Sequence, residues 1–152
     1  MVDEPPEKKL SAKQLRLGAM NILARREYSR KELADKLRQK FTPDSELLQA
    51  VLDTLVADDL LSDQRFSEAF VRWRVGKGQG PVRIGMELRE RGVDGDAVLR
   101  QCDVDWFALA EKVACKRFGE AVAIDPKQRA KRMRFLQYRG FSGEQIRAAL
   151  QG

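Results

Sequence analysis

The stretch Leu-Arg-Glu-Arg-Gly-Val at 88–93 decides the fold, because it recurs as Leu-Gln-Tyr-Arg-Gly-Phe at 136–141. A related stretch without the glycine, Leu-Arg-Gln-Lys-Phe, occupies 37–41. The copies lie roughly 50 residues apart, which is typical of tandem structural repeats. Around each copy, apolar residues recur at the three- and four-residue steps of short helices, three per copy, and no segment alternates as a strand does. The sequence therefore predicts an all-α protein made of three tandem three-helix repeats.

The repeat boundaries follow from the restarts of this pattern. We predict repeats at 13–61, 62–102 and 103–152, preceded by a flexible N-terminal tail at 1–12. Each three-helix unit is small by itself, so neighbouring repeats should share apolar surface. We expect an elongated, curved molecule with a concave face.

Helix ends are marked by capping residues. Ser29 followed by Glu32 matches a capping box, in which each side chain bonds a backbone N–H group at the helix start. Thr42-Pro43 is interpreted as the N-cap and first residue of another helix. The periodicity before Ser29 predicts a first helix running from 13 to 28.

The middle repeat contains a glycine-rich break at 76–80, Gly-Lys-Gly-Gln-Gly. The preceding helix is expected to turn Phe66, Phe70 and Trp73 inward. Nucleotide-binding glycine motifs need a strand before the glycines, and here a helix precedes them. The break is therefore interpreted as a flexible joint that also lets a backbone approach closely.

Composition excludes several classes of protein. The chain has 152 residues, of which 34% are charged and 43% hydrophobic, a balance typical of a globular protein. No window approaches the apolar length of a membrane span. The first nine residues have no apolar stretch, so we expect neither a signal nor a transit peptide. The expected location is the cytoplasm.

Catalytic and metal sites are not predicted. The chain has no histidine, which removes the commonest general base and a frequent zinc ligand. Cys102 and Cys115 are interpreted as small buried hydrophobic residues. The acid pairs at 58–59 and 103–105 are interpreted as turn residues and helix caps. We expect no enzyme activity and no cofactor.

Charge is distributed in alternating blocks within a net charge of +6. Basic residues predominate in 13–41, 72–92 and 126–152, and acidic residues predominate in 42–71 and 93–125. Basic surfaces suit phosphate backbones, and alternating charge suits a charged protein partner. Ordinary solvated helix faces are the alternative reading of the same pattern.

The basic residues cluster at equivalent places in the three repeats, which favours one continuous binding stripe. They surround the first helix–helix turn, flank the glycine break and crowd the penultimate helix. The candidate binding residues are Arg25, Arg26, Arg30, Lys31, Arg72, Arg74, Lys77, Arg83, Arg89, Arg91, Lys127, Lys131, Arg132, Arg134 and Arg139. Arg129 also belongs to the basic cluster of the penultimate helix. Most aromatic residues are at core spacing, so base stacking has little support, although Tyr138 lies among basic residues.

Three other functions remain as alternatives. Residues 29–37 could begin a DNA-binding helix-turn-helix, but the next helix, 44–57, carries acids and no Lys or Arg, so the major groove would repel it. A plain nucleic-acid-binding module would occupy single strands in competition with other proteins that bind them. An inert helical scaffold would bind neither nucleic acid nor a charged protein partner.

Several motifs in order carry a family resemblance. They are Ala-Arg-Arg-Glu-Tyr-Ser-Arg-Lys-Glu-Leu at 24–33, Leu-Leu-Ser-Asp-Gln-Arg-Phe at 60–66 and Phe-Val-Arg-Trp-Arg at 70–74. The next motif begins with Gly-Gln-Gly-Pro at 78–81 and extends through Ile84 and Glu87-Leu88 to Arg-Gly-Val at 91–93. The last motif spans 134–141, from Arg-Phe-Leu to Arg-Gly-Phe. In this order and spacing the chain resembles the RecX family over roughly 13–150, nearly its whole length.

This resemblance implies a function. RecX-family proteins are non-enzymatic regulators of the RecA recombinase, built from three-helix units. They bind the RecA filament on single-stranded DNA and inhibit its ATPase, strand-exchange and coprotease activities, which modulates DNA repair and the SOS response. Capping the filament end and lying in the filament groove are the two mechanisms considered. The expected partners are the RecA filament and, weakly or through RecA, single-stranded DNA; we expect a monomer and no membrane.

Overall fold

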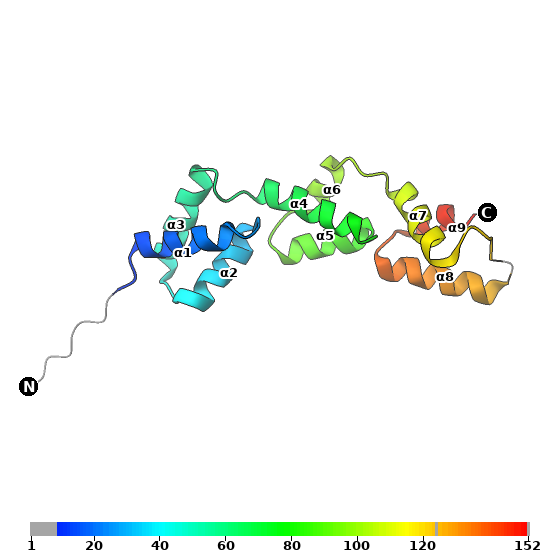
Figure 1. Cartoon of the computed structure of the whole chain (residues 1–152), viewed down its shortest axis with the longest axis horizontal. Helices are drawn as coiled ribbons and strands as arrows, with labels where there is room; N and C mark the ends of the chain where they lie inside the picture. The colour runs from blue at the N-terminus through cyan, green and yellow to red at the C-terminus, as the bar shows by residue number, and fades with distance from the viewer. Residues whose placement is uncertain (1–8, 124, 152) are drawn as a thin grey trace, which may run out of the picture. The chain divides into compact units, whose positions relative to one another are not determined.

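The computed structural model describes residues 9–123 and 125–151, and within these ranges it contains nine α-helices and no strand (Figure 1). The all-α prediction is confirmed. The chain divides into two compact units, Met1–Phe66 and Ser67–Gly152. Residues 1–8 of the expected tail lie outside the described residues. In the part of the chain that is described, no helix is long and apolar enough to cross a bilayer.

Unit 1 is a bundle of three helices, α1 (Ala12–Leu23), α2 (Arg30–Phe41) and α3 (Ser45–Ala57), each of which packs against the other two (Figure 1). The apolar stripe of each helix faces this shared core, which removes the stripes from water. The core residues are Leu15, Ala19, Tyr28, Leu33, Ala34, Leu37, Leu48, Val51, Leu52, Leu55 and Leu61.

The predicted first helix, 13–28, is too long. Helix α1 ends at Leu23, and the chain turns before Ser29 caps α2 with the predicted capping box. Tyr28 is buried in the core at this turn instead of continuing the helix. Its burial fixes the direction in which the chain enters α2, as an apolar residue before an N-cap commonly does.

The predicted start of the third helix at Thr42-Pro43 is also wrong. Thr42 adopts the left-handed conformation (φ 45°) and closes α2, while Asp44 is the N-cap of α3. The Asp44 carboxylate accepts a hydrogen bond from the Leu47 N–H at 2.8 Å. A cap–proline pair therefore predicted the turn correctly but placed the helix start too early.

The remaining helices belong mostly to unit 2, and α4 crosses the boundary between the units. They are α4 (Asp63–Gly76), α5 (Pro81–Glu90), α6 (Gly95–Gln101), α7 (Trp106–Phe118), α8 (Pro126–Arg139) and α9 (Gly143–Leu150). Helix α5 packs on α6, and α7, α8 and α9 pack on one another. The last three helices share a core of Ala110, Ala114, Leu136, Phe141 and Ile146.

Two expectations about buried residues are wrong. Trp73 is 53% exposed, whereas Phe66 and Phe70 are buried as predicted. Cys115 is exposed and Cys102 is only partly buried, so neither thiol is a core residue. The partial burial still raises the pKa of the Cys102 thiol, because desolvation disfavours the thiolate.

The glycine break has a different role from a free joint. The N–H groups of Gly80 and Val82, at the start of α5, donate to the carbonyls of Arg139 and Gly140 at the end of α8, at 2.8 and 2.9 Å. The first N–H groups and the last C=O groups of a helix have no partner within the helix. Here the N–H groups at the start of α5 bond the carbonyls at the end of α8. Pro81, between the two donors, has no N–H to satisfy. The middle and last helical repeats are joined backbone to backbone at this point.

Candidate partner-binding surface

The predicted cations lie in both units. Arg25, Arg26, Arg30 and Lys31 belong to unit 1, and the other candidates belong to unit 2. Their environments differ widely, so the structure separates cations that hold the fold from cations that face solvent.

Two arginines of unit 1 are engaged internally. Arg26 lies over the Tyr28 ring, 3.6 Å from its centroid, and pairs with Glu32 at 3.4 Å. Arg30 pairs with Asp53 on α3 at 2.7 Å. The Arg30 pair links the first helix–helix turn to α3, whereas the Arg26 contacts stay within the turn and the start of α2. Arg25 and Lys31 are exposed beside it.

A buried carboxylate organises the cations of the middle repeat. Among the described residues, Glu87 on α5 is the one charged residue that is buried. Its Oε2 lies 2.7 Å from Nη2 of Arg74 on α4, a close ion pair without the alignment of a hydrogen bond. Its Oε1 accepts from Nε of Arg83 at 3.0 Å. Arg91 donates to the Glu87 backbone carbonyl at 3.0 Å.

Arg74 is therefore engaged inside unit 2, and little of its side chain is exposed for a partner. Its side chain is only 14% exposed, and that of Glu87 only 11%. Both charges lose most of their hydration at this depth. Each is stabilised by the opposite charge beside it, whereas an unpaired charge would have nothing to replace the lost water. The pair holds α4 against α5 and thereby places the exposed residues on either side of Arg74.

Exposed aromatic rings flank this buried pair. The Arg74 guanidinium lies 4.5 Å from the centroid of the Trp73 ring, and the Lys77 ammonium lies 4.3 Å from the same centroid. The Arg83 guanidinium lies 5.6 Å from the ring centroid of Tyr138, which is 77% exposed. Cations over ring faces hold the rings in defined positions. Exposed aromatic residues next to arginines are typical of protein-binding surfaces.

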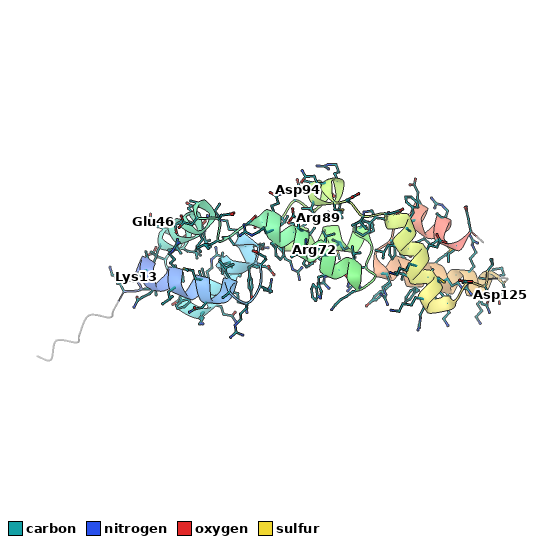
Figure 2. The ribbon with its side chains drawn as sticks, turned by 45° about the horizontal axis from the view of Figure 1, so that its top comes forward. Lys13, Glu46, Arg72, Arg89, Asp94 and Asp125 are labelled. Carbon is teal, nitrogen blue, oxygen red and sulfur yellow. The ribbon has the colours of Figure 1, made fainter. Side chains whose placement is uncertain are left out.

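Other predicted cations are exposed to solvent, most of them without an ion pair among the described residues. Arg72 on α4 (labelled in Figure 2) is exposed and has no ion pair with any described residue. Arg89 on α5 is exposed and pairs with Asp96 at 3.3 Å. On α8, several cations are exposed and have no ion pair among the described residues. These are Lys127, Arg129, Lys131 and Arg134.

The last two candidates bind backbone carbonyls. Arg132 donates to the carbonyl of Ala121 at 2.7 Å. Arg139 donates to the carbonyl of Lys77 at 2.9 Å and so reaches from α8 to the glycine break. These arginines tie segments of unit 2 together while keeping their charge at the surface.

Sequence reasoning missed Glu87 and three cations of α7, Lys112, Lys116 and Arg117. Nothing in the sequence distinguishes Glu87 from a solvated acid, because its burial depends on Arg74 and Arg83. The α7 cations lie in the block 93–125, whose net charge is negative, so the charge summed over the block concealed them. The acids of that block include N-caps of the helices, at Asp94, Asp105 and Asp125. Separating cap residues from face residues would have revealed the basic face.

Among the described residues, no group of three or more acidic or cysteine side chains could hold a metal ion. The polar side chains that converge in unit 2 are guanidiniums around one carboxylate. Such an arrangement provides charge and shape for binding, and it contains no nucleophile next to a base.

Family models match the chain in three consecutive pieces. A model of the first three-helix domain of RecX matches residues 18–52, the second domain matches 62–98 and the third matches 103–150. Together the three matches cover most of the chain.

Curated relatives and solved structures agree with these matches. A protein of Halorhodospira halophila named "Regulatory protein RecX" is 48% identical over 89% of this chain and 85% of its own length. A protein of Pseudomonas entomophila with the same name is 47% identical over 91% and 90%. The crystal structure of RecX from Lactobacillus salivarius shares the fold, with a TM-score of 0.76 at 24% identity, covering 92% of this chain and 94% of that one.

Proposed function

The chain belongs to the RecX family, and we propose that it is a non-enzymatic regulator of the RecA recombinase. The observation that carries the proposal is the match to all three RecX domains in order, together with relatives of nearly half identity named as regulatory proteins. The surface of unit 2 supports it, because the exposed rings of Trp73 and Tyr138 lie beside cations, Lys77 at the first and Arg83 at the second, and such a surface suits a charged protein partner.

In the finer form of the proposal, the protein binds the RecA filament on single-stranded DNA. Binding inhibits ATP hydrolysis, strand exchange and coprotease activity, and thereby modulates DNA repair and the SOS response. The protein acts in the cytoplasm as a monomer, without a cofactor. End capping and groove binding are the two mechanisms by which it could act. The exposed candidates, Arg25, Lys31, Arg72 and the free cations of α8, make the contacts.

The experiment that tests this function is a titration of RecA ATP hydrolysis on single-stranded DNA with the protein. Inhibition at a small fraction of the RecA concentration is expected, because a regulator that caps or destabilises a filament acts below coating ratios. Inhibition only at DNA-coating concentrations would favour competition for free DNA. No inhibition at any concentration would refute the assignment.

A charge reversal tests the contact surface within the same assay. We expect Arg72→Glu to raise the concentration for half inhibition at least about tenfold, which corresponds to about 1.4 kcal/mol of binding free energy. Arg72 has no ion pair among the described residues, so the change leaves the fold intact. The matched control is Arg100→Glu, an exposed reversal on α6 outside the candidate set. Equal effects of the two variants would contradict a specific surface.

A plain single-stranded DNA-binding module is the second candidate function. The free cations along α8 favour it, because Lys and Arg side chains without internal partners neutralise phosphates readily. The titration above separates the two candidates by stoichiometry.

A further inference from the structure

A cavity of about 770 Å³ lies in unit 2 where the end of α4 meets α7 and α8. Its size is within the range of ligand pockets, about 300–1,000 Å³. Of the cations that line it, Lys77 and Arg139 belong to the predicted binding residues, and Lys112, Lys116 and Arg117 do not. Its lining residues are Val75, Gly76, Lys77, Gly78, Leu109, Lys112, Val113, Lys116, Arg117, Phe135 and Arg139.

The charged residues that line the cavity all have the same sign. Its five charged residues are lysines and arginines, and no carboxylate lines it. None of the five has an ion pair with a described residue. The smaller cavity beside α5 differs, because there Glu87 and Glu90 stand among the arginines. The larger cavity therefore selects an anion.

The two arginines that line the cavity are held by contacts within unit 2. Arg139 is fixed by the Lys77 carbonyl at 2.9 Å and lies 5.0 Å from the Phe135 ring centroid. Arg117 lies 5.6 Å from the same centroid. Lys112 and Lys116 are exposed one helical turn apart on α7. The arginines are thus pre-positioned, and the two lysines of α7 add exposed charge to the lining of the same cavity.

The rest of the lining is apolar and suits side chains better than nucleic-acid bases. Val75, Leu109 and Val113 contribute aliphatic surface. Phe135 is the one aromatic residue of the lining, and it already carries two guanidiniums and an edge contact with Phe118 at 5.3 Å. Single-stranded nucleic acid binds best where bases stack on open rings, and this ring is occupied.

We propose that this cavity is a docking site for a short acidic peptide segment that carries an apolar side chain. The carboxylates pair with the cations at the opening, and the apolar side chain packs on Leu109 and Val113. The inference goes beyond the proposed function, because it concerns an acidic segment of any protein partner and does not require RecA.

The test measures direct binding by fluorescence anisotropy, with the full-length protein and no RecA. The probe is a fluorescein-labelled octapeptide, Asp-Glu-Asp-Leu-Glu-Phe-Asp-Glu. One matched peptide replaces Leu and Phe by Ser, and another replaces every acid by its amide. We expect the first replacement to weaken binding about tenfold, and the second to abolish it. Labelled oligo-deoxythymidine serves as the nucleic-acid comparison.

Two double variants locate the binding site. Lys112→Glu with Lys116→Glu reverses two exposed charges at the cavity, and peptide binding is expected to weaken more than about tenfold. Lys36→Glu with Lys40→Glu reverses two exposed charges at the same spacing on α2, outside the cavity and outside the predicted binding residues, and is expected to change the peptide Kd less than about twofold. Circular dichroism checks that both variants are folded.

Three outcomes would overturn the proposal. The first is no peptide binding to the wild-type protein. The second is equal weakening by the two double variants, which would mean nonspecific attraction to a basic protein. The third is a nucleic-acid site, indicated if oligo-deoxythymidine binds more tightly than the peptide and loses its binding only in the α7 variant. Each of these results leaves the RecA assay to decide the proposed function separately.

Discussion

Gly80 and Gly76 belong to one glycine-rich stretch, yet a methyl group would meet different surroundings at the two positions. A Cβ atom at Gly80 would lie 2.5 Å from the backbone carbon and oxygen of Gly140, whereas nothing lies within 4 Å of one at Gly76. Backbone atoms have no rotamer by which to move aside, so overpacking is costly there. The glycine at 80 exists for close approach of two backbones.

We therefore expect Gly80→Ala to lower the free energy of unfolding by about 2 kcal/mol. Gly76→Ala should leave it unchanged or raise it by about 0.5 kcal/mol, because Gly76 ends helix α4 in open space. Urea denaturation of both variants is the measurement. If the two variants are equally stable, the contact between α5 and α8 does not form in solution.

Glu87 provides the second prediction for a single residue. Glu87→Gln keeps the shape of the side chain but leaves Arg74 and Arg83 without their common anion, and we expect a loss of about 3 kcal/mol in unfolding free energy. The control is Glu111→Gln on α7, an exposed acid for which a change within about 0.5 kcal/mol is expected. A Glu87→Gln protein as stable as wild type would show that this pair is not required.

Caps determine where each helix begins. Ser29→Ala removes the hydrogen bond that the Glu32 N–H donates to the serine oxygen, at 3.1 Å, and should destabilise the first turn of α2 by about 1 kcal/mol. Native-state hydrogen exchange should report this as faster exchange of the Glu32 amide. Ser45→Ala, at an exposed first position of α3, is the control and should leave exchange unchanged. Unchanged exchange in Ser29→Ala would contradict the capping box.

Other features of single helices depend on contacts that lie far away in sequence. Helical spacing predicted that Trp73 faces inward with Phe70, but Trp73 is exposed beneath Arg74 and Lys77. Helical spacing predicts which residues share one face of a helix. It does not show how much of that face a neighbouring helix buries. The net charge of 93–125 concealed the basic residues of α7 for a different reason, because acids that cap helices outweigh them in the sum.

For the molecule as a whole, salt dependence measures how many phosphates it contacts. If the free cations of α8 bind single-stranded DNA, Lys131→Ala should weaken binding equally for all sequences. It should also reduce the slope of log K against log salt by about 0.7. The control is Lys36→Ala, an exposed lysine of α2 outside the candidate set. A slope that is the same in Lys131→Ala and wild type would remove α8 from the nucleic-acid surface.

The amino-acid sequence by itself determined the helical repeat, most helix starts and the family, because caps, periodicity and motif order are local properties of the chain. Only the tertiary structure decided which cations are available to a partner. Arg74, Arg83 and Arg30 look like Arg72 in sequence, but ion pairs with Glu87 and Asp53 engage the first three and leave Arg72 free. The physical reason is that pairing and desolvation depend on distances between helices, and helical periodicity contains no information about those distances.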